Sequence, residues 1–217
     1  MPAANAPEAP ENGRSRRDEL LAIAGALFAE RGFKNTTVRD IADAAGILSG
    51  SLYHHFDSKE SMVDELLDTF QTELWKSYDA IEASDQSAKA KLEAVVRASF
   101  EAIGEHRNEV AIFQSDGLYL ATFERFGYLI ERNRKFRTLW TGLLEAGVAS
   151  GELRADLDVA LVYRFLRDTV WVGVGWYRPE GSLTIEAISD QYISIVVDGM
   201  APRTRSTRNR VEGDSNG

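Results

Sequence analysis

The sequence predicts an all-α fold of about nine helices. Apolar residues recur at helical spacing along most of the 217-residue chain, capping residues stand before several of these stretches, and the alternation typical of strands is almost absent. With 44% hydrophobic residues, a chain of this length can bury one or two sizeable cores. It contains no cysteine, which excludes a disulfide scaffold, thiolate metal sites and cysteine nucleophiles and fits a cytoplasmic protein.

The two ends of the chain differ from its middle in composition. Residues 1–13 are rich in Ala, Pro and Glu and lack the apolar stretch of a signal peptide, so we expect a flexible arm. Residues 201–217 contain the polar run RTRSTRNR and are expected to form a disordered tail. Since no segment offers the roughly 20 apolar residues that span a bilayer, no membrane association is expected.

Two helices are predicted directly after the arm. Residues 15–31 place apolar side chains at helical spacing, and Gly32 follows where a C-cap glycine is expected. Thr37 and Asp40 have the spacing of a capping box, which predicts the start of a second helix that ends at Gly46. The buried stripe of this short helix would consist of Val38, Ile41, Ala42 and Ala45.

A third and a fourth helix are expected to follow closely. Ser49 is placed to cap a helix over residues 50–56. Asp57 and Glu60 have the spacing of another capping box, so the fourth helix would start there and continue to about Ala83.

The second and third helices, joined by a tight turn at residues 46–48, have the helix-turn-helix arrangement, in which the second helix enters the major groove of DNA. Ala42, Ile47, Leu52 and Phe56 would close the small core of this unit. The residues left outside can approach phosphates or base edges; they are Ser49, Gly50, Ser51, Tyr53, His54 and His55. Residues 14–60 are therefore expected to form a DNA-binding domain.

The charge balance is unusual for a nucleic-acid binder. The net charge is -9, and residues 1–65 contain seven Lys and Arg against eleven Asp and Glu. However, no carboxylate lies between Asp43 and Asp57, so the predicted contact face is not acidic. Local placement of charge must therefore supply the attraction to phosphates.

Residues flanking this unit are further candidates for phosphate contact. Lys59 lies in the first turn of the fourth helix, and Thr36 and Thr37 lie at the start of the second. Arg16 and Arg17 precede the first helix and could reach the DNA backbone or the minor groove from a mobile arm. For the charged residues the alternative is a solvated side chain. For Tyr53 the alternative is packing beside Phe56, although we favour a phosphate contact. His54 and His55 point about 100° apart on a helix, so they make a poor metal pair and no metal site is expected.

The rest of the chain predicts further helices. They cover residues 87–105, 108–115, 123–150, 157–177 and 185–200, with breaks at Gly104, Gly117, Gly151 and Pro179. The last two are apolar enough to form a four-helix interface in a homodimer.

The stretch LFAERGFKNTTVRDIADAAGILSGSLYHHFDSKESMVDELL resembles the DNA-binding domain of the TetR family of bacterial one-component repressors. The segment ASGELRADLDVALVYRFLRDTVW is similar to the entry into that family's penultimate helix. The resemblance implies that residues 61–200 form a dimeric ligand-binding domain and that the protein binds a palindromic operator. It also implies that His55, more than His54, contacts DNA.

Two further segments, DIADAAGILSGSLYHHFDSKE and LVYRFLRDTVWVGVGWYRPEG, resemble the second of the two kinds of TetR-type repressor that govern bacterial cholesterol catabolism. This resemblance implies an acyl-CoA effector, a coenzyme A thioester of a steroid ring-degradation intermediate, and no resident cofactor. A TetR-fold regulator that senses another apolar ligand, such as a fatty acyl-CoA or a drug, is the alternative.

Candidate ligand residues lie on two helices. Arg167 and Trp171 are four residues apart and share one face of an apolar helix, so a buried Arg167 would need an anionic partner and Trp171 could form a flat wall for fused rings. Asp168 is expected to point about 100° away. The alternative is an interface arginine and a core tryptophan. Arg132 and Arg134, in the basic run RNRKFR, could meet coenzyme A phosphates or simply face solvent.

An all-helical enzyme is the rival class. Such an enzyme would need a poised nucleophile or an acid–base pair, yet His106 is the one histidine outside the predicted contact helix. The phosphate-binding pattern GxxxxGK[ST] is also missing. We therefore expect a regulator without catalytic residues.

Overall fold

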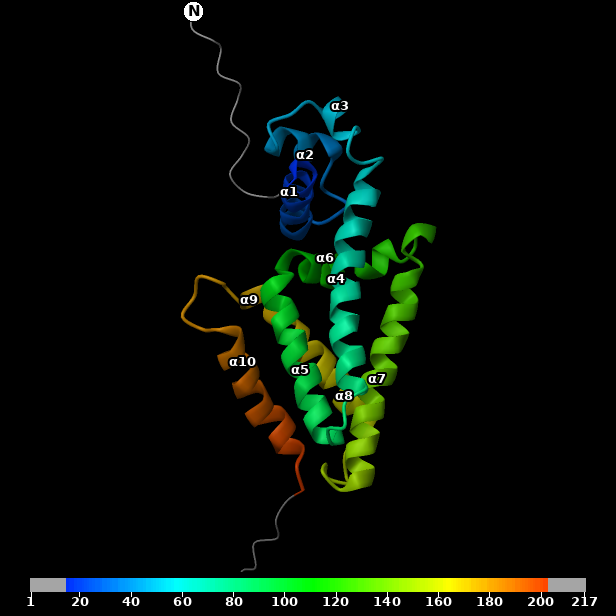
Figure 1. Ribbon diagram of the computed structural model, residues 1–217, viewed down its shortest axis with the longest axis vertical. Coiled ribbons are helices and arrows are strands. Elements are labelled where there is room, and N and C mark those ends of the chain that lie inside the picture. The colour runs from blue at the N-terminus through cyan, green and yellow to red at the C-terminus, as the bar shows by residue number, and fades with distance from the viewer. Residues whose placement is uncertain (1–14, 203–217) are drawn as a thin grey trace, which may run out of the picture.

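The computed structural model describes residues 15–202, and every regular element in that range is helical. Helices α1 (Arg16–Arg31), α2 (Val38–Ala44) and α3 (Ser49–Leu52) form a small unit at one end of the molecule (Figure 1). Helix α4 (Lys59–Glu82) begins at this unit and continues into the body of the protein. The arm predicted for residues 1–13 and the run RTRSTRNR lie outside the described residues.

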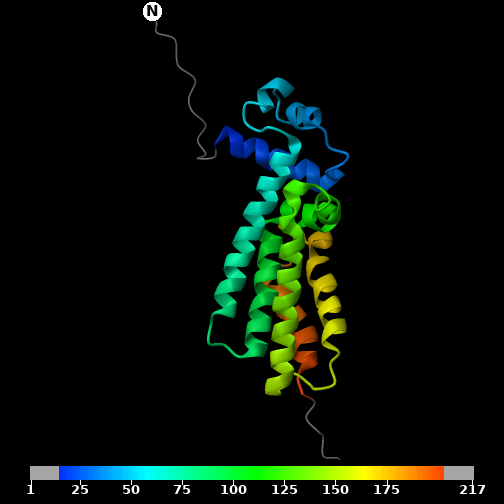
Figure 2. The same cartoon turned by 90° about the vertical axis from the view of Figure 1, so that its right-hand side faces the viewer.

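The body of the protein is a helical bundle. Long helices α4, α5 (Ala88–Glu105), α7 (Tyr128–Ser150) and α8 (Val159–Trp171) run along its length (Figure 2), whereas α6 (Arg107–Leu120) crosses beneath the small unit (Figure 1). The short elements are η1 (Glu124–Phe126), α9 (Gly173–Trp176), α10 (Ile185–Tyr192), the π-helical η2 (Ile193–Val197) and η3 (Asp198–Met200).

Two helix starts agree with the prediction. Ser15 caps α1, and Thr37 caps α2 in a complete capping box with Asp40. Gly32 follows α1 with a φ of 82°, a left-handed value that costs glycine little. Glycine is therefore the residue that allows α1 to stop there.

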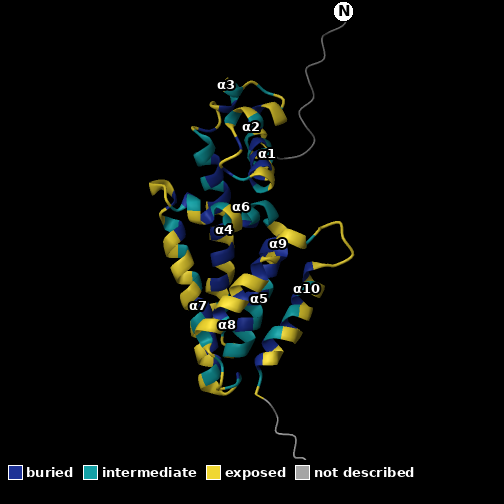
Figure 3. Ribbon diagram, turned by 180° about the vertical axis from the view of Figure 1, so that it is seen from behind, coloured by how far each residue is buried: buried dark blue, intermediate teal, exposed yellow. Residues whose placement is uncertain are grey.

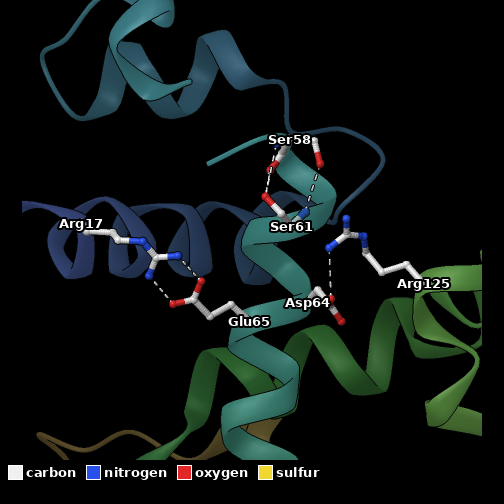
Figure 4. Close-up of polar contacts among 6 residues, drawn as sticks. All are labelled: Arg17, Ser58, Ser61, Asp64, Glu65 and Arg125. Atoms are coloured by element: carbon white, nitrogen blue, oxygen red, sulfur yellow. Dashed lines mark hydrogen bonds and ion pairs between the residues drawn. The ribbon is translucent and has the colours of Figure 1, made fainter. Parts of the chain in front are cut away.

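The predicted starts of α3 and α4 are wrong. The cap of α3 is Leu48, which makes no side-chain bond, so Ser49 is the first helical residue. This helix ends at Leu52, and residues 53–55 form turns in place of the helix predicted over residues 50–56. Ser58 and Ser61, not Asp57 and Glu60, form the capping box of α4 (Figure 4). Aspartate and serine are about equally good N-caps, so the residue type alone does not decide between two neighbouring positions.

Two of the predicted glycine breaks are also wrong, because Gly104 lies within α5 and Gly117 within α6. A Cβ on Gly104 would lie 2.9 Å from Cγ1 of Ile185, so this glycine permits close packing of α10 on α5. Gly151 does end α7, with a φ of 78°. Glycine alone therefore does not distinguish a helix end from a close helix contact.

The described residues form two hydrophobic cores. One joins α1–α3 to the first half of α4 and includes Ile112, Leu120, Phe126 and Leu129 from α6, η1 and α7. The other fills the bundle and takes Phe70, Leu74, Trp75 and Tyr78 from the second half of α4. Phe113 packs against both cores. Helices α4 and α6 therefore connect the small unit to the bundle mechanically.

No helix among residues 15–202 is both long and apolar enough to cross a membrane.

Candidate functional site

The surface formed by α3 and the turn after it presents the predicted DNA-contact residues. Tyr53 is 56% exposed, and His54 and His55 are also exposed. Nothing lies within 4 Å of the position of a Cβ on Gly50. Ser49 and Ser51 are partly exposed on the same short helix. These groups offer hydroxyl, imidazole and backbone contacts without a carboxylate.

A buried core holds this surface in place. Ile41 and Ala42 of α2 and Leu52 of α3 are buried, and Phe56 follows them after the turn. Ile47 is partly buried. Because the apolar side of α3 is anchored on both sides, its polar side faces outward.

The two threonines before α2 have different roles. Thr36 is fully buried, and its hydroxyl donates to the carbonyl oxygens of Leu27, at 3.3 Å, and Gly32, at 2.9 Å. The expected hydroxyl contact of Thr36 with phosphate is therefore wrong. The exposed Thr37 hydroxyl donates to Asp40 at 2.6 Å, and this bond together with the Thr37 N–H holds the pKa of Asp40 below its usual range.

Arg16 and Arg17 lie on α1 rather than on a mobile arm, and both have partners within the chain. Arg16 donates to the Ala45 carbonyl at 2.9 Å and pairs with Glu19 at 2.7 Å. Arg17 pairs with Glu65 of α4 through two N–H groups (Figure 4), and its guanidinium stacks 4.4 Å from the centre of the Phe56 ring. The pair raises the pKa of Arg17. These arginines fasten α1 to its neighbours, and their contact with DNA stays a prediction.

Lys59 is also engaged inside the unit. Its ammonium donates to the carbonyl oxygens of Phe33, at 2.8 Å, and Thr36, at 3.0 Å. It also lies 4.2 Å from the centre of the Phe33 ring. Lys59 therefore ties α4 to the loop before α2, and its predicted phosphate contact is untested.

Polar contacts also join the small unit to the bundle. Arg125, just before α7, pairs with Asp64 of α4 at 3.3 Å (Figure 4). The backbone N–H of Phe33 donates to Asp116 of α6 at 3.0 Å. The small unit of α1–α3 and the start of α4, called the DNA-contact unit from here on, is therefore linked to the helices that border the bundle.

A cavity of about 320 Å³ lies in the bundle below this junction. It is lined by residues of α4, α6, α7 and α8, which are Phe70, Gln71, Leu74, Trp75, Phe113, Gln114, Gly117, Leu118, Arg132, Asn133, Phe136, Arg167, Asp168 and Trp171. Its rings form a continuous wall, because Trp171 lies 6.5 Å from Phe70 and 6.1 Å from Phe136 between ring centres. Such a cavity suits a flat apolar ligand.

The cavity includes three of the four predicted ligand residues. Arg167 and Trp171 share it with Arg132, but Trp171 is buried whereas the side chain of Arg167 is 48% exposed. The expectation of a buried Arg167 without an internal partner is wrong, because its Nε donates to Asp168 at 2.6 Å. Adjacent residues point about 100° apart around the helix axis, but the arginine side chain is long enough to reach back to its neighbour. This ion pair raises the pKa of Arg167.

Arg134 does not line the cavity. It pairs with Glu131 at 2.7 Å on the exposed face of α7, so its assignment to the ligand site is wrong. Sequence reasoning missed Gln71, Trp75, Phe113 and Phe136, which line the cavity from α4, α6 and α7. Their helical spacing predicts a buried stripe, but an ordinary core stripe has the same spacing.

Among residues 15–202, no group of three or more His, Cys, Asp or Glu is placed to hold a metal ion.

Comparison with known families accounts for most of the chain. Residues 20–66 match the family described as bacterial regulatory proteins, tetR family. Residues 85–200 match the family described as tetracyclin repressor-like, C-terminal domain.

Individual relatives agree with this assignment. The chain is 59% identical to the HTH-type transcriptional repressor KstR2 of Rhodococcus jostii over 191 residues, which cover 88% of this chain and 94% of the relative. It is 53% identical to KstR2 of Mycobacterium tuberculosis over 186 residues, covering 86% and 93%. The structure of ketosteroid transcriptional regulator KstR2 of Mycobacterium tuberculosis superposes with a TM-score of 0.85 at 51% identity, over 88% of this chain and 98% of that one.

A more distant structure, AibR in complex with isovaleryl coenzyme A and operator DNA, has the same fold, with a TM-score of 0.71 at 21% identity over 84% of this chain and 98% of that one. Repressors of this family bind operator DNA and act as dimers, and the close relatives are named repressors rather than enzymes. The chain therefore belongs to the TetR family and is a helix-turn-helix transcriptional repressor.

Proposed function

We propose that this repressor binds a palindromic operator in the cytoplasm as a homodimer and is released by a coenzyme A thioester of a steroid ring-degradation intermediate. The observation that carries the proposal is the cavity, which combines a wall of aromatic rings with arginines at its exposed side. The rings suit fused carbocycles, and the arginines suit an anionic group.

The size of the cavity assigns different places to the two parts of such a ligand. Ligand sites span roughly 300–1,000 Å³, so a cavity of about 320 Å³ is at the small end. It can take a compact acyl group but not the nucleotide as well. The nucleotide would lie outside the cavity, near Arg132 and Arg167. Arg137 is a third basic residue in this region, because its charge, like that of Arg167, acts on Tyr163. Arginine is well suited to phosphates because its guanidinium binds them with two N–H groups.

The names of related proteins support the same ligand class. The solved relative from Mycobacterium tuberculosis is named a ketosteroid transcriptional regulator. AibR shows only that this fold accepts a coenzyme A thioester and DNA. A steroid-derived thioester satisfies both the aromatic wall and the basic exterior, whereas a straight acyl chain makes no use of flat walls.

The homodimer would form through α8 and the α10 region. Apolar residues that are about half exposed recur at intervals of four or seven along α8, α9 and the residue between them. They are Leu161, Phe165, Val172 and Trp176. Ile195 is exposed just after α10. Exposed residues are prominent along α8 and α10 when the molecule is viewed from behind (Figure 3). Exposed apolar side chains that gather on one face, instead of being scattered singly, are typical of a protein interface.

Release would act through α4 and α6. The second half of α4 lines the cavity, while its first half holds Arg17 and Arg125 through Glu65 and Asp64. On α6, Phe113 lines the cavity and also packs against the core of the DNA-contact unit. A ligand that prefers a shifted position of these helices would misplace α3 for the major groove. A coupling of about 1–3 kcal/mol would lower operator affinity about 5- to 150-fold.

The decisive experiment is titration of the operator complex with acyl-CoA thioesters. Arg167→Met removes the charge and Trp171→Leu removes the ring wall, so both variants should bind DNA as dimers but respond at least about tenfold more weakly to a steroid-derived thioester. Arg134→Met is the matched control, because it makes the same chemical change at an exposed position outside the cavity, and it should respond like the wild type.

The outcomes separate the parts of the proposal. If the effector releases both cavity variants from the operator at the same concentrations as the wild type, the ligand binds elsewhere. Release of the wild type by straight-chain thioesters alone would exclude the steroid ligand and leave the repressor assignment intact.

A further inference from the structure

Gln71 is the exception among the buried polar residues of the described chain. Thr36, Gln71, Ser99 and Ser189 are the four buried polar residues, and Gln71 is 4% exposed. The other three donate their hydroxyls to carbonyl oxygens, for example Ser99 to Val95 at 2.7 Å. The side-chain amide of Gln71 makes no hydrogen bond with any residue between 15 and 202. It is the one member of this set without a protein partner.

The amide of Gln71 belongs to the cavity. Gln71 lies on α4 between Phe70 and Leu74, and all three line the cavity. Within residues 15–202, the fully occluded side-chain nitrogen and oxygen atoms without a hydrogen-bond partner belong to Arg107, Tyr128, Trp140 and Arg154. The amide of Gln71 is not among them although it has no hydrogen bond, so the amide keeps part of the small remaining surface of this residue. The cavity is the space that Gln71 lines, so it is the space in which this amide can meet a ligand.

The surroundings of Gln71 make this amide selective. Aromatic rings form the wall. Three charged residues line the cavity: Arg167 and Asp168 have side chains 48% and 63% exposed, and Arg132 is partly exposed. Gln71 therefore supplies an uncharged polar group on the enclosed side. A ligand that is wholly hydrocarbon there would cut the amide off from water without replacing its hydrogen bonds, which is unfavourable. A ligand oxygen at that point would replace them.

We propose that Gln71 is a specificity-determining residue that donates an amide N–H to a ring carbonyl oxygen of the effector. This inference rests on the proposed function, in that the cavity is the effector site. It adds that the effector carries a ketone on the ring system that enters the enclosed side, whereas its anionic part stays near the arginines.

The test uses two small probes, a bicyclic carboxylic acid with a ring ketone and the same acid with a methylene in place of the ketone. Binding to the full-length dimer is followed by the fluorescence of Trp75 and Trp171, which line the cavity. The wild type should bind the ketone about tenfold more tightly, as expected for one well-placed hydrogen bond. Gln71→Met, which keeps the length of the side chain but has no amide, should remove this preference.

Two controls isolate the amide. Gln86→Met makes the same chemical change at an exposed position in the α4–α5 loop and should keep the preference for the ketone. The ligand-free melting temperature of Gln71→Met should not fall, because the amide has no protein partner to lose. A fall in stability with an unchanged ketone preference would overturn the inference and make Gln71 structural.

The remaining outcomes are also decisive. Equal binding of both acids by the wild type, or no binding of either, overturns the inference without need of a variant. If the ketone preference depends on Gln71 but the thioesters of the two acids fail to release the operator, the inference about Gln71 stands. The proposed induction by a coenzyme A thioester then fails.

Discussion

In the DNA-contact unit, α1, α2 and α4 each begin with a reciprocal capping box, whereas the described helices of the bundle have at most a single side-chain cap. The unit also ties itself together with polar contacts, such as Lys59 to two carbonyl oxygens and Arg17 to Glu65. The bundle instead depends on apolar packing, and it keeps a cavity and an exposed apolar face.

This difference corresponds to two tasks. A surface that must fit the major groove benefits from one well-defined geometry, which caps and short polar contacts supply. A region that must respond to a ligand needs two arrangements of similar free energy, and a bundle with a cavity has fewer contacts to prevent a shift. The following predictions test the contrast, beginning with the largest expected effect.

The exposed face of α8 should be essential for DNA binding even though it is remote from α3. Phe165 is 59% exposed at the centre of the apolar face, so Phe165→Asp places a charge in the proposed dimer interface. The variant should be a folded monomer whose operator affinity is at least about a hundredfold lower, because each half-site alone gives few contacts. Light scattering and gel shift measure the two effects. A stable dimer with normal DNA binding would show that the copies meet elsewhere.

Polar contacts within the DNA-contact unit should contribute measurably to stability. Lys59→Met removes the bonds to the carbonyls of Phe33 and Thr36, so the free energy of unfolding should fall by about 1–2 kcal/mol. Urea denaturation followed by circular dichroism measures this loss. If stability is unchanged while operator binding weakens, Lys59 acts mainly on phosphates and its internal contacts are incidental.

The outer surface of the same unit should behave in the opposite way. Tyr53 is 56% exposed, so Tyr53→Phe removes a hydroxyl without disturbing the core. Operator affinity should fall by roughly fivefold across operator sequences, as expected for loss of a phosphate contact, with an unchanged melting temperature. A lower melting temperature would mean that Tyr53 is part of the packing beside Phe56.

The smallest effect is expected from the capping box of α2. The Thr37 hydroxyl and N–H lower the pKa of Asp40 in the folded protein, so the ionised carboxylate contributes stability above its unfolded pKa of about 3.9. This contribution is lost as the pH falls through the lower, folded pKa. Asp40→Asn should therefore melt slightly below the wild type at pH 7, and the gap should close on acidification. A gap that stays constant with pH would assign the effect to helix propensity instead of charge.

Much of the fold could be predicted because its signals are local. Thr37 and Gly32 act within a few residues of their own positions, so their patterns identify the start of α2 and the end of α1. The same approach failed at α4, where Ser58 rather than Asp57 caps the helix, since neighbouring polar residues compete for the same N–H groups. It failed again at Gly104, whose role depends on Ile185, 81 positions away.

By itself the sequence determined the all-helical class, the helix-turn-helix unit, the exposure of Tyr53, and the shared site of Arg167 and Trp171. Each of these follows from spacing along one helix or one turn. Only the tertiary structure decided that Thr36 is buried, that Arg134 faces away, and that Gln71 of α4 shares a cavity with Trp171 of α8. The physical reason is that helical periodicity specifies which face of a helix is buried. Which helix covers that face, and whether the fit leaves a cavity, depends on packing between distant segments.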